Sequence, residues 1–159
     1  MTIRKAGPGD LQTVNDLTRR AYEHYVPIIG GEPMPMLEDY APRIAAGEVW
    51  LLEDRGAVAG LIVLEDRDDA LLIYSVAIEP ERQGTGLGQR LLSFAEDVAR
   101  RRGLRKVALF TNARMERNIG IYRRFGFIET QRREHPSRAG WVVVYMEKKL
   151  GRAENRRSA

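Results

Sequence analysis

The sequence predicts a single α/β (α+β) domain of about seven strands and about four helices in the order βααβββαβαββ. Short runs rich in β-branched and aromatic residues alternate with longer segments whose apolar residues recur at spacings of three and four. A length of 159 residues suits one domain with a sizeable core. We expect residues 1–150 to form that domain and the polar residues 151–159 to fray as a C-terminal tail.

Seven segments have the composition of strands and are bounded by turn residues. They are residues 2–6, 49–53, 58–64, 70–78, 106–111, 127–133 and 141–148. The segment Asp-Arg-Gly-Ala at 54–57 lies between two of these runs and indicates a β-hairpin. No internal repeat interrupts this succession.

Four segments have helical periodicity, namely residues 10–25, 37–46, 86–102 and 116–125. Asp10 is a good N-cap for the first of them, and its apolar residues indicate one buried face. Between the first two helices, residues 26–36 are too rich in proline and glycine for regular structure.

The helix over 86–102 carries two pairs of opposite charges at i,i+4 spacing. Glu96 with Arg100, and Asp97 with Arg101, are expected to form exposed ion pairs on its surface. Gly103 is expected to end the helix as its C′ residue.

Composition excludes several classes of function. The chain has no cysteine, so a Cys-acyl intermediate and a thiolate metal site are excluded, and two histidines do not support a zinc site. No apolar run approaches the ~20 residues of a membrane span, which favours a cytoplasmic protein without a membrane partner. The net charge of +4 is dispersed among acids, which argues against nucleic acid and suits an anionic ligand.

A glycine-spaced loop, Gln-Gly-Thr-Gly-Leu-Gly at 83–88, follows the strand at 70–78 and opens a helix. The first N–H groups of a helix lack internal partners and carry the positive end of the macrodipole, so anions bind there. Glycines at 84, 86 and 88 permit positive φ and close approach of a ligand. The loop therefore predicts a phosphate cradle.

Two common phosphate loops do not match this segment. A Walker loop needs Gly-Lys-Ser/Thr, whereas Gly88 is followed by Gln89 and Arg90. A dinucleotide fingerprint needs a third glycine three places after the second, where this chain has Gln89. Magnesium-nucleotide and dinucleotide chemistry are therefore not indicated.

The pattern that fits is Gln83-x-x-Gly86-x-Gly88, preceded by a strand and Pro80. It resembles the acetyl-CoA signature of the GCN5-related N-acetyltransferase (GNAT) superfamily. A second stretch, residues 111–127, resembles the family's later strand, short helix with a tyrosine, and Gly-Phe. The resemblance spans nearly the whole chain and implies the GNAT acyl-CoA N-acyltransferase fold, with a central mixed sheet flanked by helices.

The resemblance also implies where acetyl-CoA binds, with no metal. Family members hold it where two neighbouring strands part, here residues 71–78 and 106–111, so the backbone of Val76 and Ile78 is expected to hold the pantetheine and offer an oxyanion donor. The remaining cofactor residues implied are Gln83, Gly84, Thr85, Gly86, Leu87, Gly88 and Gln89. From their positions one helical turn before and two residues after Tyr122, Asn118 and Arg124 are also expected to contact the cofactor. For Asn118 and Arg124, a solvated helix face is an alternative reading.

Tyr122 matches the family tyrosine that acts as general acid beside the CoA sulfur. The alternative is a core aromatic with a satisfied hydroxyl. The strand at 70–78 lacks the glutamate that some relatives use as base and has Tyr74 and Ser75 instead. Ordered water, or Glu23, His24 or Glu32, are the candidates for removing the amine proton. Asn112 is expected to cap the turn that follows it.

The acceptor is expected to lie against the first two helices and the apolar segment between them. Tyr25, Ile28 and Tyr74 are the residues expected to contact it. The implied activity is direct acetyl transfer, in a ternary complex, to a primary amine of a small molecule or peptide. Two alternatives are a non-catalytic acyl-CoA-binding module and a basic nucleic-acid-binding domain. A homodimer through the closing strands also stays open.

Overall fold

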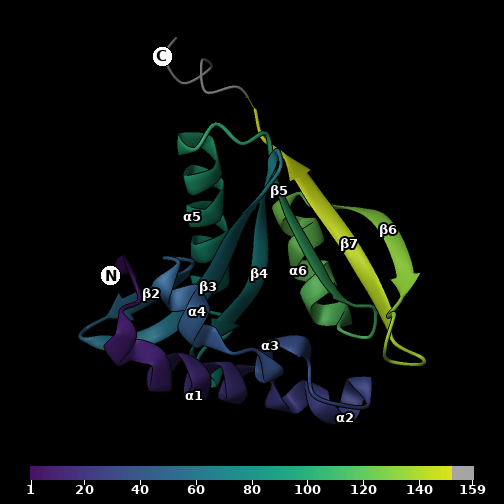
Figure 1. The fold of residues 1–159 in the computed structure, drawn as a ribbon, viewed down its shortest axis with the longest axis horizontal. Helices are drawn as coiled ribbons and strands as arrows, with labels where there is room; N and C mark the ends of the chain where they lie inside the picture. Colours follow the sequence, from purple (N-terminus) through teal and green to yellow (C-terminus); the bar gives the residue numbers. More distant parts are fainter. Residues whose placement is uncertain (152–159) are drawn as a thin grey trace.

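The computed structural model describes residues 1–151. Their seven strands form one sheet in the order β1-β2-β3-β4-β5-β7-β6 (Figure 1). The strands are β1 (Thr2–Lys5), β2 (Val49–Asp54), β3 (Ala57–Arg67), β4 (Ala70–Ile78), β5 (Lys106–Asn112), β6 (Ile128–Glu134) and β7 (Val142–Lys149). Only β4 and β5 run parallel, and the other neighbours are antiparallel. The predicted mixed sheet is confirmed.

The four predicted helices are present as α1 (Leu11–Tyr22), α4 (Tyr40–Ala45), α5 (Leu87–Arg101) and α6 (Glu116–Phe125). Short 3₁₀ turns lie at Pro8–Asp10 (η1), Glu23–Tyr25 (η2) and Pro80–Arg82 (η3). Gly103 has φ +71° at the end of α5, as its predicted C′ role requires. Of the predicted tail, residues 152–159 lie outside the described part of the chain.

The prediction that residues 26–36 lack regular structure is wrong. They contain α2 (Val26–Ile29) and the start of α3 (Met34–Leu37). Each of these helices has a proline within its first two positions, where the missing N–H has no intrahelical partner to lose. Gly30, with φ +81°, ends α2. The prolines therefore start these turns instead of preventing them.

The helices cover both faces of the sheet. Helices α5 and α6 pack with one buried cluster, which includes Leu91, Ile119 and Phe127. Helices α1 and α4 pack with a second cluster on the other face, which includes Leu17 and Ile44 (Figure 1).

The ion pair expected on the surface of α5 is not exposed. Glu96 is only 8% exposed, and its carboxylate lies 3.1 Å from Lys148 Nζ and 3.7 Å from the Arg100 guanidinium. The reason is tertiary: β7 brings Lys148 against this side of α5. For the second predicted pair, Arg101 donates to the backbone carbonyl of Asp97.

The parallel strands β4 and β5 pair over only part of their lengths. Ala70 to Ile73 lie opposite Lys106 to Leu109, and beyond that point β5 continues beside β7 alone (Figure 1). Residues 75–78 of β4 therefore pair only with β3 among the described strands, and Tyr74 has no partner in either ladder. The predicted parting of these two strands is present in the fold.

A β-bulge lies at the point where β4 and β5 part. Val63 lies opposite Ser75 and Leu64 opposite Ile73, so Tyr74 is the extra residue. Tyr74 packs on the α1 and α4 side of the sheet, as does Val63, the partner of Ser75. The bulge thus turns two consecutive residues, Tyr74 and Ser75, toward the same face.

No helix within residues 1–151 is long and apolar enough to cross a membrane.

Gly60 on β3 permits close packing beneath this end of β4. A Cβ there would lie 2.9 Å from Ile78 Cδ1 and 3.2 Å from the Ala77 carbonyl oxygen. We expect Gly60→Ala to lower the free energy of unfolding by about 1–2 kcal/mol, because the backbone oxygen has no room to move. Denaturant titration measures this, with Gly9→Ala as control, since a Cβ at Gly9 meets no atom within 4 Å. Equal stability of the two variants would contradict the close-packing argument.

Candidate active site

A cleft of about 470 Å³ lies where β4 leaves β5. Its walls come from the end of α1 and the turn after it, the far half of β4, the loop before α5, and α6. The residues that line it are Ala21, Tyr22, His24, Tyr25, Val76, Ile78, Arg82, Gln83, Gly84, Gly86, Gly88, Gln89, Leu92, Arg117, Asn118, Ile121, Tyr122 and Arg124. We call it the cofactor cleft.

The glycine loop opens into this cleft at the N-terminus of α5. Gly84 has φ +79° and Gly86, the N-cap, has φ +89°, a backbone conformation that favours glycine. Gly88 does not need a positive φ, and a Cβ added there would meet no protein atom within 4 Å. Nothing inside the described chain therefore requires glycine at 88. The open space beside it fits a ligand that approaches the helix backbone closely.

The electrostatics of the cofactor cleft favour an anion. The first turn of α5 carries no acidic residue, and its N-cap makes no side-chain hydrogen bond, so the helix N–H groups are available. Arg82, Arg117 and Arg124 line the same cleft, and Arg82 is ion-paired with Asp54 at 2.8 Å. The loop and these guanidiniums together fit a polyphosphate.

Most of the residues predicted to bind the cofactor are brought together here. Those on the cleft wall are Val76, Ile78, Gln83, Gly84, Gly86, Gly88, Gln89, Asn118 and Arg124. Two are not on it: Leu87 is buried in the core at 5% exposure, and the Thr85 hydroxyl donates to the Arg82 carbonyl. Their side chains stabilise the loop, so a direct contact with the cofactor stays a prediction without geometric support.

Two tyrosines from the first helical region tie the cleft walls together. The Tyr22 hydroxyl donates to the Val76 carbonyl over 2.9 Å, and the Tyr25 hydroxyl donates to Asn118 Oδ1 over 2.9 Å. The side-chain oxygen of Asn118 is thus engaged, and its NH₂ group is what it can offer to a ligand. A carbonyl has two lone pairs, so Val76 keeps one for another donor. Sequence patterns did not indicate either bond.

Tyr122 lies one helical turn after Asn118 on α6. Its ring packs edge-on against Phe127, with centroids 5.9 Å apart. Burial, with a smaller contribution from nearby Tyr25, raises the pKa of Tyr122 above its usual value. The hydroxyl therefore stays protonated at neutral pH, as a proton donor must. The core-aromatic and functional readings are compatible, since this ring packs on the core and also lines the cleft.

A second cleft of about 340 Å³ lies on the α1 and α4 side of the parted strands. It shares Tyr22, Asn118 and Tyr122 with the cofactor cleft. The rest of its wall is Ile29, Pro33, Met34, Pro35, Arg67, Ile73, Tyr74, Ser75, Leu109, Phe110, Thr111, Asn112, Met115, His135, Pro136, Trp141, Val143 and Tyr145. We call it the aromatic cleft. The two clefts therefore meet at Tyr122.

The three residues predicted to contact an acceptor are separated in the structure. Tyr74 lines the aromatic cleft, whereas Tyr25 lines the cofactor cleft. Ile28 is 49% exposed and lines neither. The acceptor roles of Tyr25 and Ile28 thus gain no geometric support.

Asn112 caps the next turn as expected, because its Oδ1 accepts from the Arg114 N–H over 2.9 Å.

Among the described residues that line the two clefts, none is aspartate or glutamate. Of the three candidate bases, His24 lines the cofactor cleft, while Glu23 and Glu32 are exposed and line neither cleft. The geometry therefore leaves His24 or ordered water of these candidates.

Comparison with known proteins assigns this chain to a family. Residues 11–127, which include the glycine loop and Tyr122, match the family model described as acetyltransferase (GNAT) family. The chain belongs to the GNAT family. The resemblance inferred from its two motifs is confirmed.

Two curated relatives of this GNAT chain are named mycothiol acetyltransferase. The protein from Cellulomonas flavigena is 41% identical over 58 residues, which are 36% of this chain and 17% of the relative. The protein from Beutenbergia cavernae is 33% identical over 105 residues, 57% of this chain and 33% of the relative. The chain thus spans a third or less of the length of these relatives.

Solved structures share the fold over nearly the whole GNAT chain. The ribosomal-protein-S18-alanine N-acetyltransferase of Escherichia coli has a TM-score of 0.73 at 20% identity, covering 96% of this chain and 95% of its own. The PaiA N-acetyltransferase of Thermoplasma acidophilum, solved with coenzyme A, has a TM-score of 0.76 at 19% identity, covering 94% and 98%. At these identities the likeness establishes the fold, and the prediction of a GNAT fold is confirmed.

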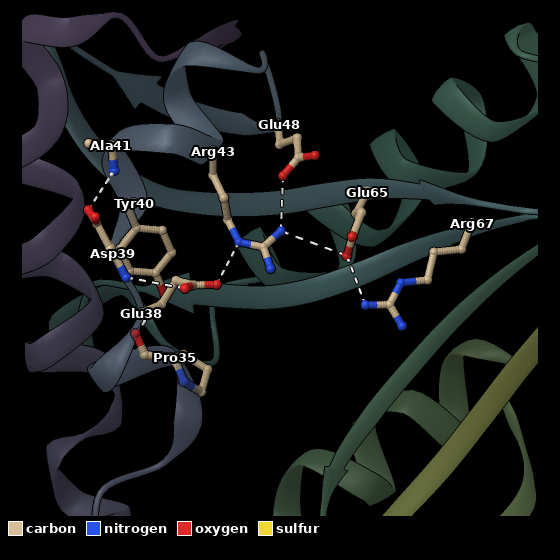
Figure 2. Close-up of polar contacts among 9 residues, drawn as sticks. All are labelled: Pro35, Glu38, Asp39, Tyr40, Ala41, Arg43, Glu48, Glu65 and Arg67. Carbon is tan, nitrogen blue, oxygen red and sulfur yellow. Dashed lines mark hydrogen bonds and ion pairs between the residues drawn. The ribbon is translucent and has the colours of Figure 1, made fainter.

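An arginine that the sequence analysis did not single out supports the aromatic cleft of this GNAT chain. Figure 2 shows Arg43 of α4 between Glu38, Glu48 and Glu65, at 2.7, 2.9 and 3.8 Å. The same guanidinium lies over the Tyr74 ring, 4.0 Å from its centroid. Burial of Tyr74, with Glu38 nearby, raises its pKa to about 12. Arg43 thus joins the α3–α4 segment, two strands and one wall of the cleft.

Replacing Arg43 by methionine tests this role. The variant leaves three carboxylates near one another without their shared cation, so we expect the free energy of unfolding to fall by about 2–3 kcal/mol. Arg43→Lys keeps the charge but cannot bridge three carboxylates or lie flat on Tyr74, and should recover only part of the loss. Denaturant unfolding of the three proteins measures the order. Full recovery by lysine would show that charge alone matters.

Proposed function

We propose that this GNAT chain is an acetyl-CoA-dependent N-acetyltransferase that transfers acetyl directly to a primary amine while both substrates are bound. The observation that carries the proposal is the meeting of two clefts at Tyr122. One cleft has the cationic, glycine-lined character that suits a phosphate-bearing cosubstrate. The other is mainly apolar and suits an acceptor.

The cofactor cleft offers a separate set of groups for each part of acetyl-CoA. The N-terminal N–H groups of α5, with Arg82 and Arg124, would hold phosphates. The backbone of Val76 and Ile78, which no strand covers on the β5 side, would pair with the pantetheine. Asn118 would offer its amide NH₂. A solved structure of a GNAT-fold protein from Salmonella typhimurium, YncA, carries acetyl-CoA and has a TM-score of 0.72 at 22% identity, covering 95% of this chain and 94% of its own.

When bound, acetyl-CoA supplies an acetyl group activated as a thioester. Tyr122 holds a proton on Oη at neutral pH and lies where the clefts meet, so it is placed to protonate a departing thiolate. The Tyr22 bond to the Val76 carbonyl holds that peptide in one orientation, so neighbouring N–H groups can stabilise developing oxyanion charge. The proton lost by the amine leaves through His24 or water.

Direct transfer is favoured over a covalent enzyme intermediate. The chain has no cysteine, and the two clefts share Tyr22, Asn118 and Tyr122 on their walls. An amine in the aromatic cleft would thus lie next to a thioester in the cofactor cleft and would need no relay.

A second candidate is a non-catalytic acyl-CoA-binding module. The observation that favours it is the lack of a carboxylate among the residues lining either cleft. The two functions differ in one respect: only an acetyltransferase releases free CoA thiol faster when an amine acceptor is added.

Gly88→Leu tests the cosubstrate. We expect acetyl-CoA to bind at least ~10-fold more weakly, because the leucine side chain would occupy the space beside the helix N-terminus, whereas the family pattern admits alanine there. The free energy of unfolding should be unchanged or higher by up to about 1 kcal/mol, since leucine is a better helix former than glycine. Calorimetric titration with acetyl-CoA, beside CoA, NAD and ATP, measures the affinity. Ser93→Leu, on the exposed face of α5, is the matched control. Wild-type binding of NAD or ATP equal to that of acetyl-CoA would contradict the proposal.

Tyr122→Phe tests the proton donor. We expect kcat to fall about 100-fold, as general-acid catalysis is lost, while acetyl-CoA affinity stays within about twofold. Because the pKa of Tyr122 is raised, wild-type activity should show no descending limb from this group below about pH 10. Thiol release under saturating acceptor measures kcat. Tyr40→Phe removes a phenol hydroxyl from a ring that lines neither cleft; the hydroxyl donates to the carbonyl of Pro35, a residue on the wall of the aromatic cleft, so kcat should fall far less than in Tyr122→Phe. Unchanged kcat in Tyr122→Phe would remove Tyr122 from the chemistry.

A further inference from the structure

The aromatic cleft has a row of three rings along the parted strands. Tyr74 of β4, Phe110 of β5 and Tyr145 of β7 follow one another across the sheet, with centroids 6.4 and 6.1 Å apart. Phe110 and Tyr145 are direct partners in the β5–β7 pairing. Ile29, Met34 and Trp141 add apolar surface to the same cleft. This wall can bury a phenyl-sized group.

The described wall of the aromatic cleft offers no counter-ion to a cation. The charged side chain on its wall is Arg67, and no carboxylate of the described chain lines it. Glu38 lies near Tyr74 but does not line the cleft, and its carboxylate accepts a hydrogen bond from Arg43. Glu65 is bound to Arg67 at 3.2 Å and lies 3.8 Å from Arg43. A protonated amine would therefore enter without a counter-ion.

The histidine of this cleft is not placed to accept a proton. His135 Nδ1 accepts the Ser137 N–H over 3.2 Å, so in the neutral ring the proton sits on Nε2. That nitrogen is then a donor. His24 lies on the cofactor side and does not line the aromatic cleft.

The amine must therefore arrive neutral, which selects strongly by its own pKa. An α-amino group with a pKa near 7.8 is about one-third neutral at pH 7.5, whereas a lysine ε-amine with a pKa near 10.4 is about one-thousandth neutral. At pH 7.5 the neutral fraction of the α-amino group is therefore roughly 250 times that of the lysine ε-amine. The aromatic cleft does not reduce this ratio, because its described wall has no carboxylate and its His135 Nδ1 is already bonded to the Ser137 N–H.

We infer that the acceptor carries an amine of pKa near 8, as the α-amino group of an amino-acid amide or peptide does, next to an aromatic or large apolar side chain. This inference rests on the proposed function and narrows its acceptor. Lysine side chains and polyamines are excluded as preferred acceptors, because no carboxylate of the described residues lines the cleft to bind their charged form. In the reaction, the amine nitrogen forms a bond to the acetyl carbon, the carbon–sulfur bond breaks, and one amine proton leaves as the thiol gains one.

A panel of four acceptors with saturating acetyl-CoA at pH 7.5 tests the inference. Phenylalaninamide has both features, 2-phenylethylamine has the ring with a basic amine, glycinamide has the α-amine without the ring, and Nα-acetyl-lysinamide has a basic ε-amine. We expect kcat/KM for phenylalaninamide to exceed that for glycinamide by about 30-fold, from burial of the ring. It should exceed that for 2-phenylethylamine by about 100-fold, and that for Nα-acetyl-lysinamide, which also lacks the ring, by more. Thiol release and the mass of the acetylated product are measured.

A variant of the row of rings separates ring recognition from general damage. Phe110→Ala should raise KM for phenylalaninamide about 10-fold and leave kcat/KM for glycinamide and the affinity for acetyl-CoA unchanged. Tyr145→Ala, at a residue already 37% exposed, gives the same test if the first variant does not fold. Ile128→Ala, 62% exposed on β6 and outside both clefts, is the control that should change neither.

The outcomes separate the inference from the proposed function. If acetyl-CoA binds and a basic amine is preferred, or none of the four acceptors is acetylated, the inference is overturned and cosubstrate binding stands. If acetyl-CoA does not bind, both are overturned. The expected order of acceptors, lost selectively in Phe110→Ala, supports both.

Discussion

The parting of β4 from β5 after Ile73 is the constraint on which the site depends. Parallel strands normally satisfy each other's backbone groups, and here residues 74–78 lose that neighbour. The bulge at Tyr74 and the continued pairing of β5 with β7 hold the strands apart. The opened strand, the N-terminus of α5 and the inner face of α6 then converge on one space. Each of these elements alone is an ordinary part of an α/β domain.

Charge is divided sharply between the clefts and their supports. The clefts are lined by arginines, histidines and neutral residues. The nearby carboxylates of Glu38, Glu65 and Asp54 do not line either cleft and are ion-paired with arginines. Arg43 binds three carboxylates and lies on Tyr74, which keeps negative charge outside the aromatic cleft and holds its wall. Walls of this kind suit a polyphosphate and offer no counter-ion to an ammonium ion. In the function that we propose, the same distribution binds one substrate and selects the other by its protonation state.

Three tyrosines join the helical layer to the opened strands. Tyr22 binds the exposed backbone of β4, and Tyr25 binds Asn118 of α6. Tyr122 completes the junction from the other side, where the clefts meet. Because two of these rings use their hydroxyls to hold backbone and side chains in place, the position of α1 and the geometry of the site are coupled. A shift of α1 would release both bonds at once.

The sequence by itself determined the succession of elements, the glycine loop and the candidate proton donor. Hydrophobic periodicity and turn chemistry are local, so the strand at 70–78 and the helix at 116–125 agree with β4 and α6 at both ends. Only the tertiary structure decided where β4 and β5 separate, that Tyr25 lies on the cofactor side, and that Glu96 is buried against Lys148. It also decided that Arg43 supports Tyr74. These features join residues far apart in the chain, and no short window of sequence contains both partners.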